Sequence, residues 1–323
     1  MNLDISKLSI MLLTSIILSL VMGKFLIKLL IRAKIGQSIR DDGPKAHLTK
    51  QGTPTMGGII FIISTLITLL IFKGYSHENI LIVLSMLGFG LVGFVDDFFK
   101  LVMKRSLGLT ELQKIVFQIV MSFGLIYLAS RVSEKSISLI SIPFTNVEFD
   151  LGIFAYPILA FIMIGTVNAT NITDGIDGLV TSVSIPVFAA LTIIGLSRNS
   201  SIPIFTIIFL GSLIGFLVYN SNPASVFMGD TGSMAIGGAL VMIALIMNAP
   251  LYLVILGGVY VIETMSVIIQ VISYKTRNKK RVFLMSPIHH HYELKGYKEP
   301  KIVAAFTTLS TIFSILTIIG LRS

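Results

Sequence analysis

Long apolar runs alternate with short polar segments along the whole chain, and this alternation predicts ten membrane-spanning helices. A helix needs about 17 to 25 mostly apolar residues to cross a bilayer, and the runs approach or reach that length. The predicted spans cover residues 8–31, 56–72, 79–95, 113–130, 153–170, 179–196, 202–219, 234–249, 251–273 and 302–321. Nothing between them marks a soluble domain, so we expect residues 1–323 to form a single integral membrane domain, all-α and polytopic.

Basic residues between the runs predict which side of the membrane each polar segment faces. If both termini lie outside, the inside segments are 32–55, 96–112, 171–178, 220–233 and 274–301. Sixteen Lys and Arg residues then lie inside and six outside, the bias that is typical of a cytoplasmic face. The same bias accounts for the formal net charge of +9 without any nucleic acid as a partner.

Composition supports a membrane protein and excludes some chemistry. Hydrophobic residues make up 54% of the chain and charged residues 13%, which is more apolar surface than one soluble core buries. The first run is too long for a signal-peptide core and is expected to be retained. Because the chain has no cysteine, disulfides, thiolate zinc sites and cysteine nucleophiles are excluded.

Two features carry no assigned chemistry. The outside segment 131–153 contains residues 138–142 and 147–149, whose composition predicts a small β-hairpin. Glu263 falls inside a predicted span, where a charged side chain is costly and needs a partner or a helix break; its role stays open.

Seven of the nine aspartates lie in the predicted inside segments. Carboxylates gathered in this way raise one another's pKa unless a metal ion or Lys and Arg side chains neutralise them. The pattern therefore predicts an active site on the cytoplasmic face. The seven are Asp41, Asp42, Asp96, Asp97, Asp174, Asp177 and Asp230.

Asp96 and Asp97 end the third predicted span, and Lys100 follows one helical turn later. Adjacent carboxylates can share a metal ion or a proton, and the lysine can bind phosphate or keep a carboxylate ionised. A plain charged helix end is the alternative, although acids at a helix C-terminus oppose its dipole.

Two further aspartate motifs flank predicted spans. Asp174 and Asp177 are three positions apart in segment 171–178, so a helical turn would put them on one face; Asx-turn chemistry alone is the alternative. Asp230 directly precedes the eighth span, where free backbone N–H groups can bind phosphate and the carboxylate can hold a cation. There the alternative is a simple helix cap.

The remaining candidates are basic, polar or aromatic. In segment 50–58, Thr53 and Pro54 suit the cap and first turn of a helix, which leaves Lys50 and Thr55 as ligand candidates. Phe227 can stack on a planar base. His289, His290 and His291 cannot all point the same way, so we expect one or two of them to meet phosphate or sugar oxygens rather than a three-histidine zinc site.

Aspartates with Mg²⁺, basic residues and a nucleotide cradle at an inner membrane surface together favour phosphoryl transfer from a soluble nucleotide donor to a lipid acceptor. A cation-coupled transporter is the alternative from another class. It is expected to place carboxylates at mid-membrane, whereas here only Glu263 is embedded.

Taken together and in order, segments 50–58, 96–100, 171–178, 227–233 and 289–291 resemble phospho-N-acetylmuramoyl-pentapeptide transferases, within the polyprenyl-phosphate N-acetylhexosamine-1-phosphate transferase superfamily. The resemblance covers essentially the whole chain. It implies transfer of phospho-MurNAc-pentapeptide from UDP-MurNAc-pentapeptide to undecaprenyl phosphate, giving lipid I and UMP, the first membrane step of peptidoglycan synthesis. It also implies Mg²⁺, the bacterial cytoplasmic membrane and a homodimer.

The resemblance further implies residue roles. Asp230 would bind Mg²⁺, Asp96 or Asp97 would act as base on the lipid phosphate, and His289 would take part in catalysis beside His290 and His291 on the sugar-phosphate side. Lys100 and Lys104 would meet phosphate, with Thr55 as a further substrate contact. The uridine pocket would be lined by Lys50, Asn171, Asp174, Gly175, Ile176, Asp177 and Phe227.

A sibling transferase using UDP-N-acetylglucosamine is the nearest alternative, although segment 53–58 and the unbroken triple histidine look more like the muramoyl enzymes. The choice between direct attack and a covalent aspartyl intermediate, the identity of the base and the third residue of the pentapeptide stay open.

Overall fold

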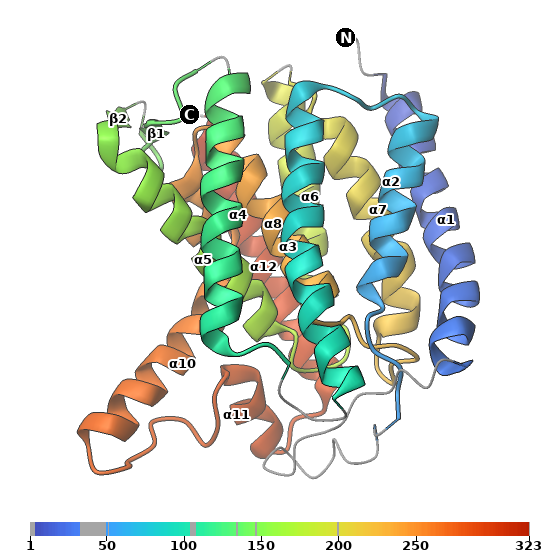
Figure 1. The fold of residues 1–323 in the computed structure, drawn as a ribbon, viewed down its shortest axis with the longest axis vertical. Coiled ribbons are helices and arrows are strands. Elements are labelled where there is room, and N and C mark those ends of the chain that lie inside the picture. The colour runs from blue at the N-terminus through green and yellow to red at the C-terminus, as the bar shows by residue number, and fades with distance from the viewer. Residues whose placement is uncertain are drawn as a thin grey trace.

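The computed structural model describes residues 4–32, 50, 52–103, 108–133, 135–145, 147–198 and 200–322. These residues form a bundle of α-helices with one small hairpin (Figure 1). The elements are, in chain order, α1 (Ile5–Arg32), α2 (Gly58–Ile71), α3 (His77–Val102), α4 (Glu111–Val132), β1 (Leu139–Ser141), β2 (Glu148–Asp150), the 3-10 helix η2 (Gly152–Phe154), α5 (Ala155–Thr173), α6 (Leu179–Ser197), α7 (Ile202–Asn220), α8 (Gly229–Ile246), the 3-10 helix η3 (Pro250–Tyr252), α9 (Leu253–Leu256), α10 (Gly258–Thr276), α11 (Ile288–Leu294) and α12 (Glu299–Arg322).

The all-α, polytopic class is confirmed. Within the described ranges, eight helices are long and apolar enough to cross a membrane, or nine if the bent pair around Gly257 counts as one span. The remaining predicted span, 56–72, corresponds to α2, which has only 14 residues and is therefore about 21 Å long.

α2 is short because the segment before it is extended and pairs with a distant part of the chain. The carbonyl of Pro54 accepts a hydrogen bond from Phe227 N at 2.8 Å, and Gly57 N donates to Phe227 O at 2.8 Å. The prediction that Thr53 and Pro54 begin this helix is therefore wrong: α2 starts at Gly58, with Gly57 as its N-cap.

The predicted span 251–273 is present but is not straight. The helical segments Pro250–Leu256 and Gly258–Thr276 meet at Gly257 with a bend of 84°. As a result α10 points away from the bundle, toward the lower left of Figure 1.

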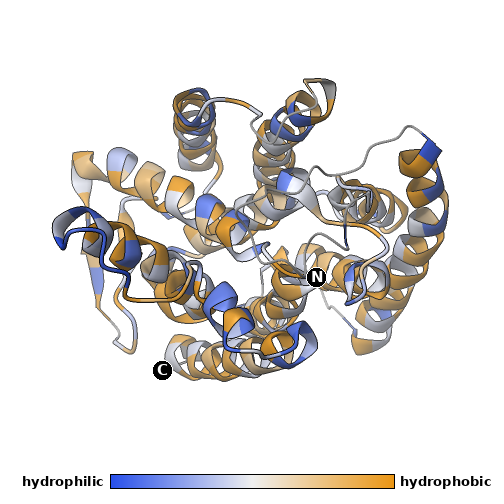
Figure 2. Cartoon of the chain, turned by 90° about the horizontal axis from the view of Figure 1, so that it is seen from below, coloured by the Kyte–Doolittle hydropathy of each residue, from blue (hydrophilic) through white to orange (hydrophobic). Residues whose placement is uncertain are grey.

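α8 forms the centre of the bundle. It packs most extensively on α3 and also contacts α5 and α2, while α7 packs on α1 and α6, and α6 on α12. Almost all of α8 is buried, whereas outer helices such as α1 and α4 expose Leu13, Phe25 and Val120. Seen from below, the helices are mostly hydrophobic and the hydrophilic stretches lie toward their ends and connections (Figure 2), as expected for lipid-facing outer surfaces.

The predicted hairpin is confirmed as β1 paired antiparallel with β2, with Ile140 opposite Phe149. It is tied to the bundle by Asn248, whose Nδ2 donates to the carbonyls of Ser136 and Leu139 at 2.8 Å each. The hairpin lies at the same end of the bundle as the end of α12 (Figure 1).

At the opposite end, α3, α5 and α7 terminate and α4, α6, α8 and α12 begin (Figure 1). The described parts of the predicted inside segments therefore share one end of the bundle. Which side of the membrane this end faces remains a prediction.

We expect Gly93→Ala to destabilise the α3–α8 packing, since a methyl group at this position would overlap with the backbone carbonyl of Asp230. Overpacking a well-packed contact costs about 1–3 kcal/mol, so the thermal midpoint measured in detergent should fall. Gly124→Ala on α4 is the matched control, because nothing lies within 4 Å of its added methyl group. Equal midpoints for the two variants would contradict the packing described here.

Candidate active site

Three carboxylates meet where α3 and α8 come together at the polar end of the bundle. Asp96 and Asp97 lie near the end of α3, and Asp230 lies in the first turn of α8. One oxygen from each of the three lies within 4.8 Å of the others. The predicted inside segments 96–112 and 220–233 therefore come together in the structure.

Asp97 caps the start of α8 from the neighbouring helix. Its Oδ1 accepts a hydrogen bond from Asp230 N at 3.2 Å, and its Oδ2 accepts from Thr231 N at 3.0 Å and from Thr231 Oγ1 at 2.7 Å. Met228 is the N-cap residue of α8, and its own side chain makes no capping hydrogen bond. A carboxylate at this position also interacts favourably with the α8 dipole.

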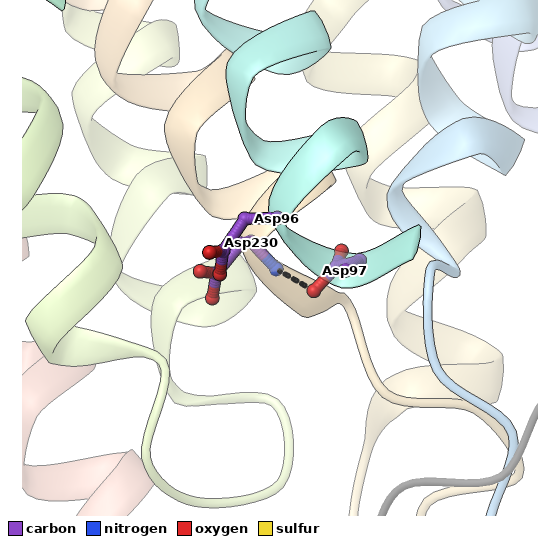
Figure 3. Close-up of side chains that lie close together, drawn as sticks. All are labelled: Asp96, Asp97 and Asp230. Carbon is purple, nitrogen blue, oxygen red and sulfur yellow. Dashed lines mark hydrogen bonds between the residues drawn. The ribbon is translucent and has the colours of Figure 1, made fainter. Parts of the chain in front are cut away.

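Asp96 points to the other side of α3, toward the side chain of Asp230 (Figure 3). Its Oδ1 accepts from Leu109 N at 2.8 Å, and its Oδ2 lies 2.7 Å from Lys100 Nζ. The two neighbouring aspartates therefore have different surroundings: Asp97 is engaged by backbone, and Asp96 shares its surroundings with Asp230 and a lysine.

Two lysines neutralise this pair of carboxylates. Asp230 Oδ2 lies 3.1 Å from Lys100 Nζ and 2.8 Å from Lys114 Nζ. Lys114 Nζ is also 4.0 Å from Asp96 Oδ2. The cluster thus combines acceptors for a cation with two cationic groups that can bind phosphate oxygens.

Asn171 at the end of α5 connects this cluster to a third helix. Its Nδ2 donates to Asp230 Oδ1 and to Ser233 Oγ, each at 2.9 Å, and its Oδ1 accepts from Lys114 Nζ at 3.3 Å. One turn away, the amides of Gln118 and Asn168 bond to each other at 2.8 and 3.2 Å. This amide pair fixes how α4 and α5 are aligned along their lengths, and it thereby places Lys114 beside Asp230.

Sequence reasoning missed Lys114 and Ser233. Lys114 fell inside the predicted span 113–130 and was assigned to the membrane. A lysine at the very start of an apolar run, preceded by the acid Glu111, was the available signal, since such residues mark a helix end rather than its interior.

Asp174, the residue after α5, carries a carboxyl whose pKa is raised to about 8. Burial is the main cause, and the negative charges of Asp230, Asp97 and Asp177 add to it. The Asp174 carboxyl is therefore largely protonated at neutral pH in the protein by itself. A cation placed near Asp230 would favour its ionised form.

Asp177 does not join the carboxylate cluster but forms a second one. Its Oδ1 lies 2.8 Å from Lys50 Nζ, which also contacts Glu299 Oε1 at 2.5 Å. Its Oδ2 accepts from Ala224 N at 3.0 Å and from Asn222 Nδ2 at 3.1 Å. Lys50 and Asp177, both predicted site residues, are thus brought together, with Glu299 as a partner that the sequence did not suggest.

A cavity of about 510 Å³ opens beside this second cluster. It is lined by Asp177, Gly178, Leu217, Asn222, Val303 and others from the facing ends of α6, α7 and α12. It lies apart from the three-carboxylate cluster, and Asp177 is the predicted site residue that contributes to its wall.

Thr55 and Phe227 lie side by side on the two paired segments described above. Thr55 is buried, and its Oγ1 lies close to Gly229, whose positive φ of 75° leads the chain from this pairing into α8. Phe227 is half-buried. Both therefore lie at the start of α8, beside Asp230.

The three histidines have separate partners, as their spacing on one short helix predicts. His289 Nδ1 lies 3.0 Å from Glu263 Oε2, and both side chains are fully buried. His290 Nδ1 lies 2.6 Å from Glu293 Oε2, while His291 Nδ1 accepts from Leu284 N at 3.1 Å. The pKa of His291 is lowered by burial and by Lys295, in agreement with a neutral ring that accepts this bond.

Gly175 and Ile176 complete the turn between α5 and α6. Gly175 lies against the His289 ring, and Ile176 is buried. Lys104, Asp41 and Asp42 lie outside the described residues, so their predicted contributions are not placed.

Comparison with known proteins identifies relatives along almost the whole chain. A model described as glycosyl transferase family 4 matches residues 79–248, and one described as phospho-N-acetylmuramoyl-pentapeptide-transferase signature 1 matches residues 50–62. Similar proteins named phospho-N-acetylmuramoyl-pentapeptide-transferase occur in Halalkalibacterium halodurans (46% identity over 312 residues, 95% of each chain), Desulfitobacterium hafniense (45% over 320 residues, 95% of each chain) and Bacillus subtilis strain 168 (44% over 307 residues, 94% of each chain).

The raised pKa of Asp174 predicts that divalent cations bind more tightly as the pH rises. Asp174 ionises near pH 8, and its negative charge favours a cation near Asp230, so the association constant should increase as the pH rises toward about 8 and change less above it. Calorimetric titration with Mg²⁺ or Mn²⁺ from about pH 6 to 9 measures this. Asp174→Asn should flatten the dependence, whereas Asp150→Asn, an exposed residue on β2, should leave it unchanged. An equally steep slope in Asp174→Asn would disprove the assignment.

Proposed function

Because this chain belongs to the phospho-N-acetylmuramoyl-pentapeptide transferase family, we propose how the residues described above carry out that family's reaction. The protein transfers phospho-MurNAc-pentapeptide from UDP-MurNAc-pentapeptide to undecaprenyl phosphate in the bacterial cytoplasmic membrane, which gives lipid I and UMP. The observation that carries the mechanism is the joint cluster of Asp96, Asp230, Lys100 and Lys114 at one end of the bundle. The relatives named above all carry the name of the muramoyl-pentapeptide transferase, which favours the muramoyl donor over the simpler sugar.

In the direct route, which the base assigned below would serve, a phosphate oxygen of the lipid attacks the phosphorus that carries the sugar. A new P–O–P bond forms to the lipid, and the bond to UMP breaks, with UMP leaving as a phosphate anion. The protein must therefore neutralise negative charge on both phosphates and hold them in line. Lys100 and Lys114 supply two positive charges for this, and both already lie within hydrogen-bond distance of one Asp230 oxygen.

Mg²⁺ fits the carboxylate cluster, since carboxylate oxygens are ligands it prefers. Asp230 would hold the ion. Asp97 is the weaker candidate, because both of its oxygens already accept bonds from the start of α8. When bound, the ion would neutralise charge on the diphosphate.

Of the two aspartates that the sequence offered as base, Asp96 is the one we assign. Its carboxylate shares the space between Lys100 and Asp230, where the lipid phosphate would be bound by the two lysines. It would accept the proton of a monoprotonated lipid phosphate, so that the attacking oxygen carries full negative charge. Asp97 then acts as a positioning residue for α8.

The donor would lie on the side of the 174–177 turn. Lys50, Asn171, Asp174, Gly175, Ile176, Asp177 and Phe227 would line the uridine pocket, with Phe227 stacking on the base. Thr55 lies beside Gly229, at the start of α8. His290 and His291 would face the sugar-phosphate side, and Lys104 would meet phosphate.

The orientation in the membrane and the oligomeric state are proposed from the sequence. The excess of Lys and Arg in the predicted inside segments supports a cytoplasmic active site with both termini outside. A homodimer is proposed on the family resemblance alone.

UMP release by the purified protein in detergent with undecaprenyl phosphate tests the proposed function. UDP-MurNAc-pentapeptide should be turned over only with Mg²⁺, and UDP-N-acetylglucosamine should not be turned over. Asp230→Asn should reduce release to background while the protein keeps its thermal midpoint. Turnover of the simpler sugar alone would move the protein to the sibling family, and full activity of Asp230→Asn would remove the metal site.

Asp96→Asn and Asp97→Asn should have different effects on kcat and on the thermal midpoint. Losing the base should lower kcat by about 10²–10⁴-fold at an unchanged thermal midpoint. Asp97→Asn weakens the cap of α8 and leaves buried N–H groups poorly paired, at a cost of about 1–3 kcal/mol, so its midpoint should fall along with its activity. Melting curves and UMP release on the same preparations measure both effects. A stable, inactive Asp97→Asn beside an active Asp96→Asn would reverse the assignment.

A further inference from the structure

Glu263 is a carboxylate with no exposure, in the second turn of α10. Burying a charge in an apolar span is costly unless a partner offsets it. His289 from α11 is that partner: its Nδ1 lies 3.0 Å from Glu263 Oε2, and its ring is fully buried too. Among the described residues, neither carboxylate oxygen of Glu263 and neither ring nitrogen of His289 forms a hydrogen bond, so the close approach of Oε2 and Nδ1 brings together two buried polar side chains that have no other polar partner.

Glu263 belongs to a polar stripe on α10 that serves one segment of the chain. Glu263, Ser266, Gln270 and Ser273 are spaced three and four residues apart and are all buried, so they share a helix face. Gln270 Oε1 accepts from Val282 N and Phe283 N at 2.9 and 3.0 Å, and Ser273 Oγ donates to Lys280 O at 3.0 Å. This face therefore organises the segment from Lys280 to His289.

The other side of His289 touches the turn between α5 and α6. A side-chain carbon added to Gly175 would overlap with the imidazole at Nε2, so the ring lies directly against this glycine. Asp174 precedes Gly175, and Asp177 follows it by two residues. A shift of the His289 ring would therefore either move this turn or leave it unsupported.

His289 also packs on the next histidine. The ring centroids of His289 and His290 are 4.2 Å apart with an interplanar angle of 63°. One buried imidazole thus contacts both the turn and a residue assigned to the sugar-phosphate side.

We propose that Glu263 is a positioning residue for donor binding: its carboxylate fixes the His289 ring, and the ring supports Gly175 and the 174–177 turn. His289 accordingly acts through packing rather than through contact with the reacting atoms. The proposal rests on the donor site described under the proposed function, and it places the effect on the nucleotide side, since neither Glu263 nor His289 contacts Asp96, Lys100 or Lys114.

The test compares steady-state kinetics of Glu263→Leu, Glu263→Gln and the parent protein, with donor and acceptor varied separately. Glu263→Leu should raise the donor KM by about tenfold, which corresponds to about 1.4 kcal/mol of lost binding, and leave the acceptor KM within about twofold. Glu263→Gln keeps an oxygen at the same place and should lie between the two.

Tyr260→Phe is the matched control on the same helix. It removes one buried hydrogen bond, from Tyr260 OH to Ser184 Oγ at 2.7 Å, one turn before Glu263 and away from α11. It should lower the thermal midpoint slightly and change neither KM. A donor KM equal to the parent's in Glu263→Leu, or equal rises in both KM values, would overturn the proposal.

If Glu263→Leu does not accumulate as folded protein, Glu263→Gln decides the test, because Gly175 itself lines the proposed uridine pocket and replacing it would change donor binding directly. An unchanged donor KM in Glu263→Gln would then overturn the proposal. A smaller thermal stabilisation by UMP in Glu263→Gln than in the parent protein is the readout that does not need turnover. Should the parent protein fail to use the pentapeptide donor, the proposed function falls, and the UMP shift still tests Glu263.

Discussion

The hydrogen bonds from the start of α8 to Asp97 are the contact on which the site depends. Asp97 is buried between two apolar helices and would be costly there by itself, but three donors from Asp230 and Thr231 satisfy it. The same bonds fix how α8 begins. Because the Asp230 backbone is held by Asp97, its side chain is directed to the opposite side, toward Asp96 (Figure 3).

Helix geometry alone therefore gives the two adjacent aspartates different surroundings and different roles. Successive side chains on an α-helix point about 100° apart, so Asp97 faces α8 while Asp96 faces the lysines. The cost of placing acids near the end of α3 is offset at the start of α8, where the dipole has the opposite sign. Lys100 and Lys114 neutralise Asp96 and Asp230, whereas the pKa of Asp174 is raised mainly by burial and further by the neighbouring negative charges.

The features that the sequence predicted correctly depend on local pattern. Apolar runs, the 138–149 hairpin and the grouping of aspartates at one end follow from the order of residues. The failures come from contacts between distant segments. Thr53 and Pro54 look like a helix start, but the Pro54 carbonyl accepts a hydrogen bond from Phe227, far along the chain, so the helix begins only at Gly58. Lys114 looks like part of a span until Asn171 and Asp230 are seen beside it.

The bend at Gly257 belongs with the polar stripe on α10. A straight span would point Glu263 and Gln270 into lipid or into an apolar core, where neither has a partner. Turning α10 out of the bundle by 84° lets that face cover the segment from Lys280 to His289, while Ile268 and Ile272 on the other face remain exposed. The 174–177 turn is consequently held from two sides, by Lys50 and Glu299 at Asp177 and by His289 at Gly175. Three elements that are distant in sequence, the segment before α2, α10 with α11, and the start of α12, therefore converge on one short turn, which explains how so small a segment is held in place at the end of the bundle.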